Sequence, residues 1–274
     1  MRSRAAFRRF VVPEVSLLRA ALSAAFIYAA VVAWVWVTSD RMIFLPPAPS
    51  YRDTPDVLRL STAGGERIAA LYLPNPAATY TMLFSHGNAE DLGAVRPLLP
   101  ALGDLGFSVF AYDYRGYGLS EGRPSEPNVY ADIDAAYEYL TRELRVPPAR
   151  IILYGRSLGA GAAVDLAARK VVGGLVLESP FLTAFRVMTR VPLFPFDKFR
   201  NVDKIGRVRC PVLIMHGEAD EIVPLWHGRQ LFEGAPGPKT FVAIPGAHHN
   251  DFMWVAGARY AAALRDFETL LRGR

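Results

Sequence analysis

The feature that most constrains this chain is an alternation of strand-length apolar runs with longer helix-like segments, from residue 57 to the C-terminus. The first two runs, 57–62 and 67–74, are separated by Gly64-Gly65 and predict a hairpin. Six further runs lie at 79–87, 107–116, 151–155, 175–180, 211–217 and 240–246. Helix-like segments lie at about 91–104, 127–144, 224–233 and 252–272. This order predicts an α/β fold with a mostly parallel central sheet of about eight strands and helices on both faces.

A glycine-flanked serine follows one of these strands directly. The strand IILY is followed by Gly155-Arg156-Ser157-Leu158-Gly159, and then by the helix-like run AGAAVDLAARK. The pattern G-x-S-x-G between a strand and a helix is typical of a nucleophile elbow, where the glycines relieve crowding around a strained turn. We therefore predict that Ser157 is a nucleophile and that Gly155 and Gly159 form its elbow.

A serine nucleophile needs a base, and the chain has five histidines. His248 and His249 lie between the last predicted strand and the last predicted helix, where the order Ser…Asp…His places the base. The residues alone leave the two open. We expect His86 to brace a loop, His216 to be a turn or core histidine, and His227 to be solvated on a polar helix.

The acid of such a triad follows a strand and precedes the histidine. Asp220, in HGEADEIVP after the strand PVLIM, fits this position. Glu218 and Glu221 are rivals in the same loop, and Glu178 is an alternative because it ends the preceding strand. We predict that Asp220 is the acid and that the three glutamates are solvated.

The developing oxyanion needs two backbone donors. We assign one to the N–H of Leu158, which follows the nucleophile. The other is assigned to the N–H of Asn88, in the loop SHGNAE, where Gly87 allows a close approach. The sequence DYRGYG at 113–118 is expected to form a turn held by structural hydrogen bonds.

Several classes of function find no support in the sequence. There is no G-x-x-x-x-G-K-[ST] or H-E-x-x-H motif, and Cys210 is the one cysteine, so no cofactor or metal is predicted. Residues 1–41 hold six arginines and two acidic residues, which leaves 25 basic and 24 acidic residues in 42–274. This near-neutral body does not indicate a nucleic-acid surface.

The N-terminal region contains an uncharged stretch, AALSAAFIYAAVVAWVWVTS, at 20–39. Twenty helical residues span about 30 Å, the thickness of a bilayer core, so we predict a single-pass membrane anchor. A cleaved signal peptide and a buried core helix are the alternatives. The apolar stretch is longer than the roughly 7–15 residues of a signal peptide, and no small-x-small cleavage site follows it.

Charge also predicts the orientation of this anchor. Five arginines precede the span and one follows it closely, so the N-terminus is expected in the cytoplasm and the large domain outside, in the periplasm of a bacterium. The predicted organisation is therefore a basic cytoplasmic N-terminus (1–19), the transmembrane anchor (20–39), a linker (40–55) and a catalytic domain (56–274).

Five motifs jointly resemble the α/β-hydrolase superfamily over about residues 55–272: SHGNAE, DYRGYG, GRSLG, HGEADEIVP and GAHHND. The set is most similar to the subgroup that includes membrane-associated serine hydrolases and protein depalmitoylases, and FDKFRNVDKIGRVRCPVLIMHG adds to the match. In that subgroup the late motif commonly reads G-x-G-H-N-D. The resemblance therefore implies that His249 is the base, with His248 at the usual glycine position.

The resemblance implies an α/β-hydrolase fold and acyl transfer. We expect a carboxylesterase or thioesterase acting on a small-molecule or lipid-like acyl substrate, with a serine peptidase or a non-catalytic binding protein as alternatives. The depalmitoylases attach through lipidated N-terminal cysteines, which this chain lacks, so their substrate is not carried over. The phenylalanine-rich segment between 180 and 211 is expected either to line an acyl-binding groove near the membrane or to pack a connecting helix onto the core.

Overall fold

The computed structural model describes residues 17–273. The chain divides into two units, residues 1–39 and residues 40–274. The described part of the first unit belongs to one helix, α1 (Leu17–Ile43), which contains the whole predicted span 20–39. Within 17–273, α1 alone is long and apolar enough to cross a membrane, a test that a signal sequence also passes. The basic segment predicted at 1–19 lies almost entirely outside the described residues.

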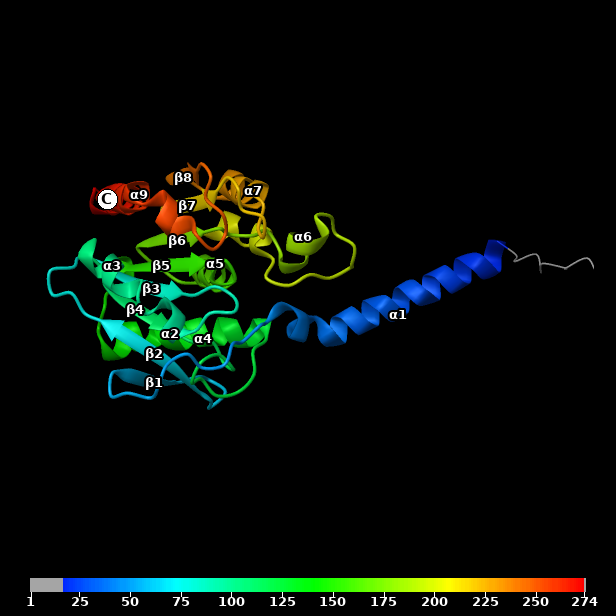
Figure 1. The fold of residues 1–274 in the computed structure, drawn as a ribbon, viewed down its shortest axis with the longest axis horizontal. Coiled ribbons are helices and arrows are strands. Elements are labelled where there is room, and N and C mark those ends of the chain that lie inside the picture. Colours follow the sequence, from blue (N-terminus) through cyan, green and yellow to red (C-terminus); the bar gives the residue numbers. More distant parts are fainter. Residues whose placement is uncertain (1–16, 274) are drawn as a thin grey trace, which may run out of the picture. The chain divides into compact units, whose positions relative to one another are not determined.

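The second unit is built on one eight-stranded sheet with the order β1-β2-β4-β3-β5-β6-β7-β8 (Figure 1). The strands are β1 (Val57–Ser61), β2 (Arg67–Leu73), β3 (Thr81–Ser85), β4 (Ser108–Tyr112), β5 (Ile151–Arg156), β6 (Gly174–Glu178), β7 (Val212–Gly217) and β8 (Lys239–Ile244). The predicted hairpin is the antiparallel pair β1–β2, and β2 is also antiparallel to β4. All other pairs are parallel. The predicted fold class is confirmed.

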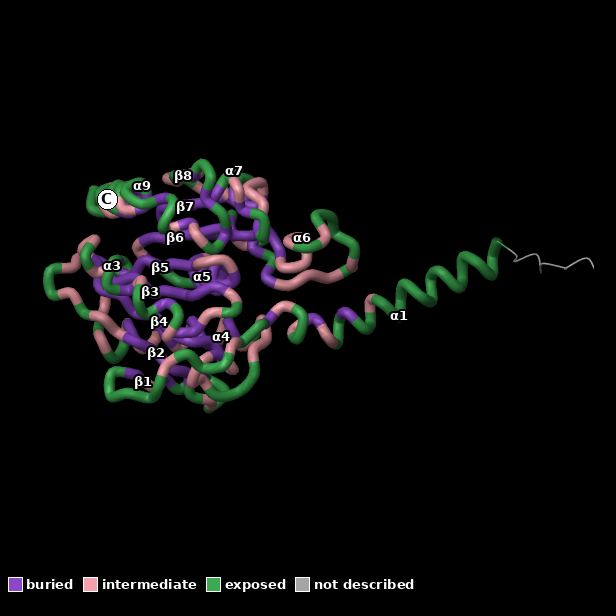
Figure 2. The backbone as a smooth tube through the Cα atoms, viewed as in Figure 1, coloured by how far each residue is buried: buried purple, intermediate pink, exposed green. Residues whose placement is uncertain are grey.

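Helices cover both faces of the sheet, and each face has its own apolar core. One core joins α4 (Glu126–Glu138), α5 (Gly159–Arg169) and α7 (Trp226–Gly234) to side chains such as Leu83 and Leu153. The other joins α2 (Leu92–Val95), α3 (Leu99–Asp104), α8 (Phe252–Ala256) and α9 (Ala258–Arg272) to Met82 and Ile152. Successive strand residues point to opposite faces, which is why neighbours along β3 and β5 enter different cores. Figure 2 shows the resulting buried sheet between exposed helix surfaces.

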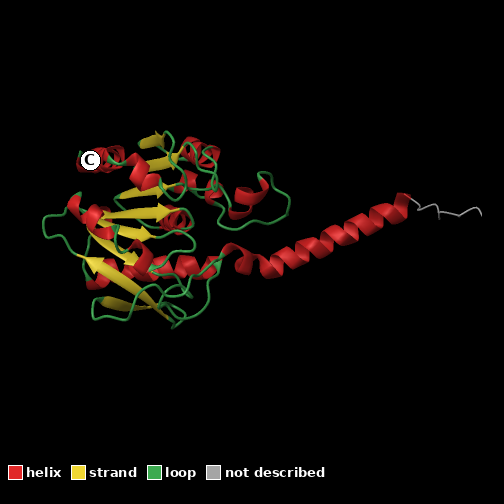
Figure 3. Cartoon of the chain, in the orientation of Figure 1, coloured by secondary structure: helices red, strands yellow, loops and turns green. Residues whose placement is uncertain are grey.

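Three predicted helices are interrupted. The segment 91–104 forms α2 and α3, with Pro100 at the start of α3, where its missing N–H costs nothing. The segment 127–144 ends as one π-helical turn, Tyr139–Glu143. The last helix breaks at Gly257, whose φ of +47° favours glycine, and so becomes α8 and α9 (Figure 3).

The segment expected as a linker belongs to the compact second unit. Phe44 is 4% exposed and packs edge-on against Phe199, with ring centroids 5.9 Å apart. The Ser50 N–H donates to Asp91 Oδ2 at 2.7 Å, and the Tyr51 hydroxyl donates to Asp113. Residues 44–51 therefore pack on the rest of the second unit although they form no helix or strand.

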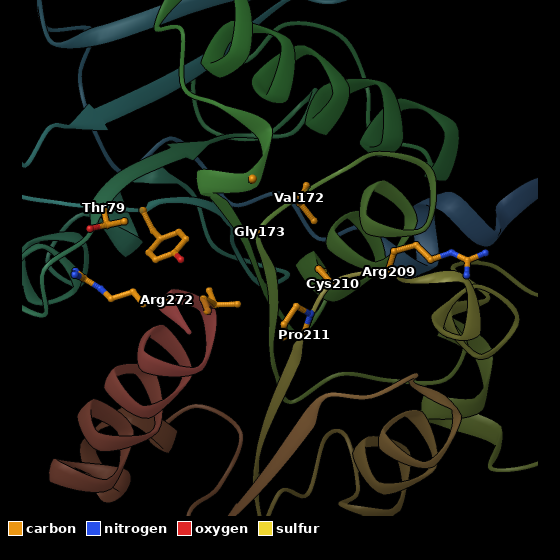
Figure 4. A pocket seen from close by; sticks show the side chains of 10 residues that line it. Thr79, Val172, Gly173, Arg209, Cys210, Pro211 and Arg272 are labelled. Carbon is orange, nitrogen blue, oxygen red and sulfur yellow. The ribbon is translucent and has the colours of Figure 1, made fainter. Parts of the chain in front are cut away.

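A cavity of about 580 Å³ lies at the amino ends of the parallel strands (Figure 4). Its lining includes Thr79 before β3, Gly173 before β6 and Pro211 before β7. In Figure 4 the side chains of Arg209 and Arg272 border it from two sides. Reactive groups in parallel sheets gather at the carboxyl ends of the strands, so this cavity lies at the opposite edge.

Candidate active site

Ser157 lies on the turn between β5 and α5, with a φ of +49° that non-glycine residues rarely adopt. Its N–H donates to the Glu178 carbonyl at 2.9 Å. Both flanking positions must be glycine, because backbone atoms of neighbouring residues lie too close to them for a β-carbon. A β-carbon at Gly155 would lie 2.6 Å from the Gly159 carbonyl oxygen, and one at Gly159 would lie 2.1 Å from that of Ser85. The turn therefore has the strained geometry expected of a nucleophile elbow.

A continuous hydrogen-bonded chain links this serine to a histidine and a carboxylate. His249 Nε2 lies 2.9 Å from Ser157 Oγ, and His249 Nδ1 lies 2.8 Å from Asp220 Oδ2. Both side chains are buried: that of Asp220 is 0% exposed and that of His249 is 8% exposed. The structure thus brings together the three residues predicted as nucleophile, base and acid, from the connections after β5, β7 and β8.

Asp220 is held in its charged form. Burial alone would raise the pKa of this carboxyl, but hydrogen bonding and charge interaction with His249, together with the Val223 N–H, lower that pKa below its ordinary value. Its Oδ1 accepts from the N–H groups of Ile222 at 3.1 Å and Val223 at 2.7 Å. An ionised, fixed carboxylate can orient the imidazole and stabilise its protonated form.

The two adjacent histidines occupy different surroundings. His248 faces outward, with Nδ1 2.9 Å from Glu221 Oε2, and both side chains are more than half exposed. The backbone N–H of His248 donates to Asp251 Oδ1 at 2.7 Å. His249 alone reaches Ser157, as the family motif implies. Glu218 and Glu221 are exposed, as expected.

The loop after β3, residues 86–90, approaches the serine. A β-carbon at Gly87 would lie 3.8 Å from the Ser157 Cβ. Within residues 17–273, the backbone N–H groups of Asn88 and Leu158 donate to no protein atom, whereas the Asn88 side chain donates to the Ile43 carbonyl and accepts from Leu45 and Tyr117. These are the two donors predicted for an oxyanion.

His86 braces this loop. The histidine is buried, with Nδ1 2.8 Å from the Gly87 carbonyl oxygen and Nε2 3.2 Å from Asp113 Oδ1. Burial lowers the pKa of His86, but the neighbouring Asp113 carboxylate more than offsets it and raises the pKa above the usual value. The Tyr114 hydroxyl donates to the His86 carbonyl at 2.7 Å. The DYRGYG turn thus has the structural role expected of it.

A charged network that the sequence did not suggest lies beside the elbow. Arg156 is bonded to Glu90 through Nη1 and lies 3.2 Å from Glu178 through Nε. Glu90 Oε2 in turn accepts from the Gly87 N–H at 2.7 Å. Arg156, the second residue of the elbow, therefore fastens the loop that carries Asn88. The sequence signal that could have revealed this network is an arginine at the second position of the elbow together with an acidic residue, Glu90, in SHGNAE.

Two predictions about polar residues are wrong. Glu178 is 1% exposed and bonded to the Tyr154 hydroxyl, and burial raises the pKa of its carboxyl. His227 is fully buried, because the face of α7 that carries His227, Gly228 and Leu231 packs inward. His216 is a core histidine as predicted, with Nε2 2.7 Å from the Val223 carbonyl oxygen.

Comparisons with known proteins agree with this fold. The family model described as "Serine aminopeptidase, S33" matches residues 76–196. Alpha/beta hydrolase domain-containing protein aho-3 of Caenorhabditis elegans is 39% identical over 256 residues, covering 83% of this chain and 76% of that protein. Alpha/beta hydrolase domain-containing protein 17B of Homo sapiens is 37% identical over 244 residues, covering 78% and 85%.

Solved structures show the same fold. The esterase Pf2001 of Pyrococcus furiosus superimposes with a TM-score of 0.70 at 18% identity, covering 84% of this chain and 98% of that one. Est1E of Butyrivibrio proteoclasticus, solved with ferulic acid bound, gives 0.66 at 20% identity, covering 79% and 100%.

The fold, the elbow and the family matches together define a serine hydrolase of the α/β-hydrolase fold. Relatives more than 30% identical match over most of both chains, so the protein belongs to the family of α/β hydrolase domain-containing protein 17. The resemblance to the depalmitoylase-related subgroup, found in the motifs, is thereby confirmed.

Proposed function

We propose that the protein is an acyl hydrolase that cleaves carboxylic ester or thioester bonds through an acyl-enzyme on Ser157. The observation that carries the proposal is the unbroken chain Asp220–His249–Ser157, with its two hydrogen bonds of 2.8 and 2.9 Å. The proposed oxyanion donors are the N–H groups of Leu158, the residue after Ser157, and of Asn88, in the loop after β3, and neither donates to an acceptor within residues 17–273. A nucleophile, a base and an orienting carboxylate in hydrogen-bond contact support acyl transfer as the reaction.

In the first half-reaction, Ser157 Oγ attacks the acyl carbon while His249 Nε2 accepts the hydroxyl proton. The carbonyl oxygen becomes an oxyanion, which the amides of Leu158 and Asn88 stabilise. His249 then gives its proton to the departing alkoxide or thiolate. In the second half-reaction, water gives a proton to His249 Nε2 and attacks the acyl carbon; the bond from that carbon to Ser157 Oγ then breaks, His249 returns the proton to Ser157 Oγ, and the carboxylic acid leaves. Asp220 stays ionised throughout and stabilises the imidazolium.

Membrane attachment is the second part of the proposal. We infer that residues 20–39 anchor the chain in a bilayer as a single span, with the N-terminus in the cytoplasm and the catalytic domain outside it. The length and hydropathy of α1 and the arginines that precede it support this arrangement. A catalytic domain held at a membrane suits a lipid-like acyl substrate.

The first experiment uses the full chain in detergent micelles. Turnover of p-nitrophenyl esters from short to long acyl chains is measured beside an acyl thioester and a p-nitroanilide. We expect ester and thioester hydrolysis that Ser157→Ala lowers by about a thousandfold or more. Circular dichroism checks that the variant keeps its fold, since Ala lacks only the hydroxyl.

The family model of a serine aminopeptidase, matched over 76–196, favours a peptidase as the second candidate. Cleavage of the anilide in preference to every ester would replace the acyl-hydrolase assignment by that one. Folded protein that acts on none of the three substrates would instead favour a binding protein.

A further inference from the structure

The chain between α1 and β1 is hydrogen-bonded to the loop that follows β3. We call residues 43–51 the strap, and residues 86–92, which carry the Asn88 N–H, the oxyanion loop. The strap begins at Ile43, the last residue of α1, and its other residues form no helix or strand. Its hydrogen bonds reach the oxyanion loop at two places, Asn88 and Asp91.

One side-chain amide makes the first of these connections. Asn88 Nδ2 donates to the Ile43 carbonyl at 2.6 Å, and Asn88 Oδ1 accepts from the Leu45 N–H at 3.0 Å. The buried Tyr117 hydroxyl donates to the same Oδ1 at 2.7 Å and accepts from the Leu45 N–H at 3.2 Å. The residue whose N–H is a proposed oxyanion donor is therefore fixed by its own side chain to the backbone of the strap.

The second connection lies near the other end of the oxyanion loop. The Ser50 N–H donates to Asp91 Oδ2 at 2.7 Å, and the Ser50 hydroxyl donates to Asp91 Oδ1. Asp91 Oδ1 also accepts from the Ala94 N–H at 3.0 Å, as the N-cap of α2. A β-carbon at Gly93 would lie 2.2 Å from Ser50 Oγ, so the strap and α2 are in close contact.

The backbone between the two connections has an uncommon conformation. Ala89 has a φ of +56°, in the left-handed region that alanine rarely adopts. Such a conformation persists only where its surroundings fix it. Ala89 is itself exposed, so the contacts that fix it are those of its neighbours. Glu90 is bonded to Arg156, and the residues on either side of that pair of positions, Asn88 and Asp91, are bonded to the strap.

We propose that the strap holds the oxyanion loop so that the Asn88 N–H faces the carbonyl oxygen of the substrate, and that the side chains of Asn88 and Tyr117 are the positioning residues of this hold. The proposal rests on the proposed acyl hydrolysis at Ser157. Because Ile43 ends α1, the oxyanion donor then depends on the residues at which the chain leaves that helix.

The first test is steady-state kinetics of the full chain in micelles on a soluble p-nitrophenyl ester. Asn88→Ala keeps the backbone N–H and deletes the side-chain amide. We expect kcat to fall about thirtyfold with KM and the pH profile little changed, because a displaced donor loses transition-state stabilisation alone.

The matched control is Asn75→Ala, in the connection that enters β3. The Asn75 side chain likewise bonds the backbone through both atoms, donating to the Gly103 carbonyl at 3.3 Å and accepting from the Ala77 N–H at 3.0 Å. Asn75→Ala should keep the wild-type kcat. An Asn88→Ala enzyme with wild-type kcat, or an equal fall in Asn75→Ala, would overturn the proposal.

A second variant removes a single oxygen atom. Tyr117→Phe should lower kcat about fivefold and should lower it no further when combined with Asn88→Ala, because the hydroxyl acts through that amide. Tyr137→Phe is its control, since the Tyr137 hydroxyl donates to the Val171 carbonyl at 3.0 Å, away from the strap. Effects that multiply in the double variant would reject Tyr117 as a positioning residue.

Amide hydrogen exchange of residues 86–92 gives a readout that needs no turnover. Exchange should be about tenfold faster in Asn88→Ala than in wild type or Asn75→Ala, because the loop opens locally when its hold is lost. Unchanged exchange would overturn the hold of the strap on the loop. Faster exchange in a chain whose wild type hydrolyses no ester would support that hold and reject the proposed activity, which separates the two.

Discussion

His227 accepts a hydrogen bond from the Leu182 N–H at 3.2 Å while its ring stacks on Trp226. Burial, with the charge of Arg186 as a smaller cause, lowers the pKa of His227 from 6.5 to about 4. The folded protein therefore keeps this imidazole neutral at pH values where the unfolded chain protonates it. The unfolding free energy that the neutral imidazole contributes is therefore fully present above pH 6.5 and is lost as the pH falls toward 4.

Replacing His227 by Asn should remove this loss, because the amide oxygen can accept the same N–H and does not titrate. Between pH 7 and pH 4 we expect wild type to lose up to ~3 kcal/mol more unfolding free energy than His227→Asn. Urea unfolding of the full chain in micelles measures it. His248→Asn is the control. His248 is exposed and His227 is intact in this variant, so it should lose at least as much stability between pH 7 and pH 4 as wild type does. Parallel pH profiles for wild type and His227→Asn would contradict the buried neutral state.

The histidines also show what sequence can reveal about single residues. Ser157 was assignable because its elbow is a local pattern. His249 needed the family motif, since two adjacent histidines share every local property. His227 and Glu178 were misassigned because burial of a polar residue depends on which helix face or strand end packs inward, and that is decided by partners distant in sequence.

Among the elements, the loop after β3 is the one whose position the chemistry most depends on. Arg156 and Glu90 fasten it, with side chains only 15% and 22% exposed, so the pair is shielded from solvent. In Glu90→Gln the amide oxygen can still accept from the Gly87 N–H, but the charge facing Arg156 is lost. We expect kcat to fall about tenfold with KM little changed, which corresponds to ~1.4 kcal/mol in the transition state.

Steady-state kinetics on a soluble ester provides this measurement. The matched control is Glu121, which pairs with Arg67 of β2. Glu121 likewise accepts a backbone N–H, that of Arg67 at 2.9 Å, and pairs with its guanidinium. That pair is 61% and 45% exposed, so Glu121→Gln should change neither kcat nor KM. A Glu90→Gln enzyme with lower thermal stability but normal kcat would reduce the Arg156–Glu90 pair to a structural role.

Element order was predictable because the strand and helix periods differ and the strands are strongly apolar. The positions at which the elements begin and end were less predictable. The predicted helices 91–104 and 252–272 each break, at positions where Pro97 and Gly257 gave a local signal that apolar periodicity outweighed. The packing of 44–51 on the body could not be read from sequence, because Phe44 is buried by Phe199, far along the chain.

At the scale of the whole molecule, the arginines before α1 should decide which side of the membrane the catalytic unit occupies. A C-terminal fusion to alkaline phosphatase, which folds actively only outside the bacterial cytoplasm, should be active, and a fusion to green fluorescent protein should be dark. Changing Arg2, Arg4, Arg8 and Arg9 to Ala should reduce the phosphatase signal. A bright fluorescent fusion of the unchanged chain would place the catalytic unit in the cytoplasm.

The proposed reacting groups come from four separate connections, those after β3, β5, β7 and β8. The connection between β6 and β7, residues 179–211, supplies none of them. Evolution can therefore lengthen, shorten or exchange that one connection while the bond-breaking apparatus stays intact. Relatives of this protein can diverge in what they recognise without inventing a new way to cleave it, and grafting residues 184–196 between them is a direct route to altered selectivity.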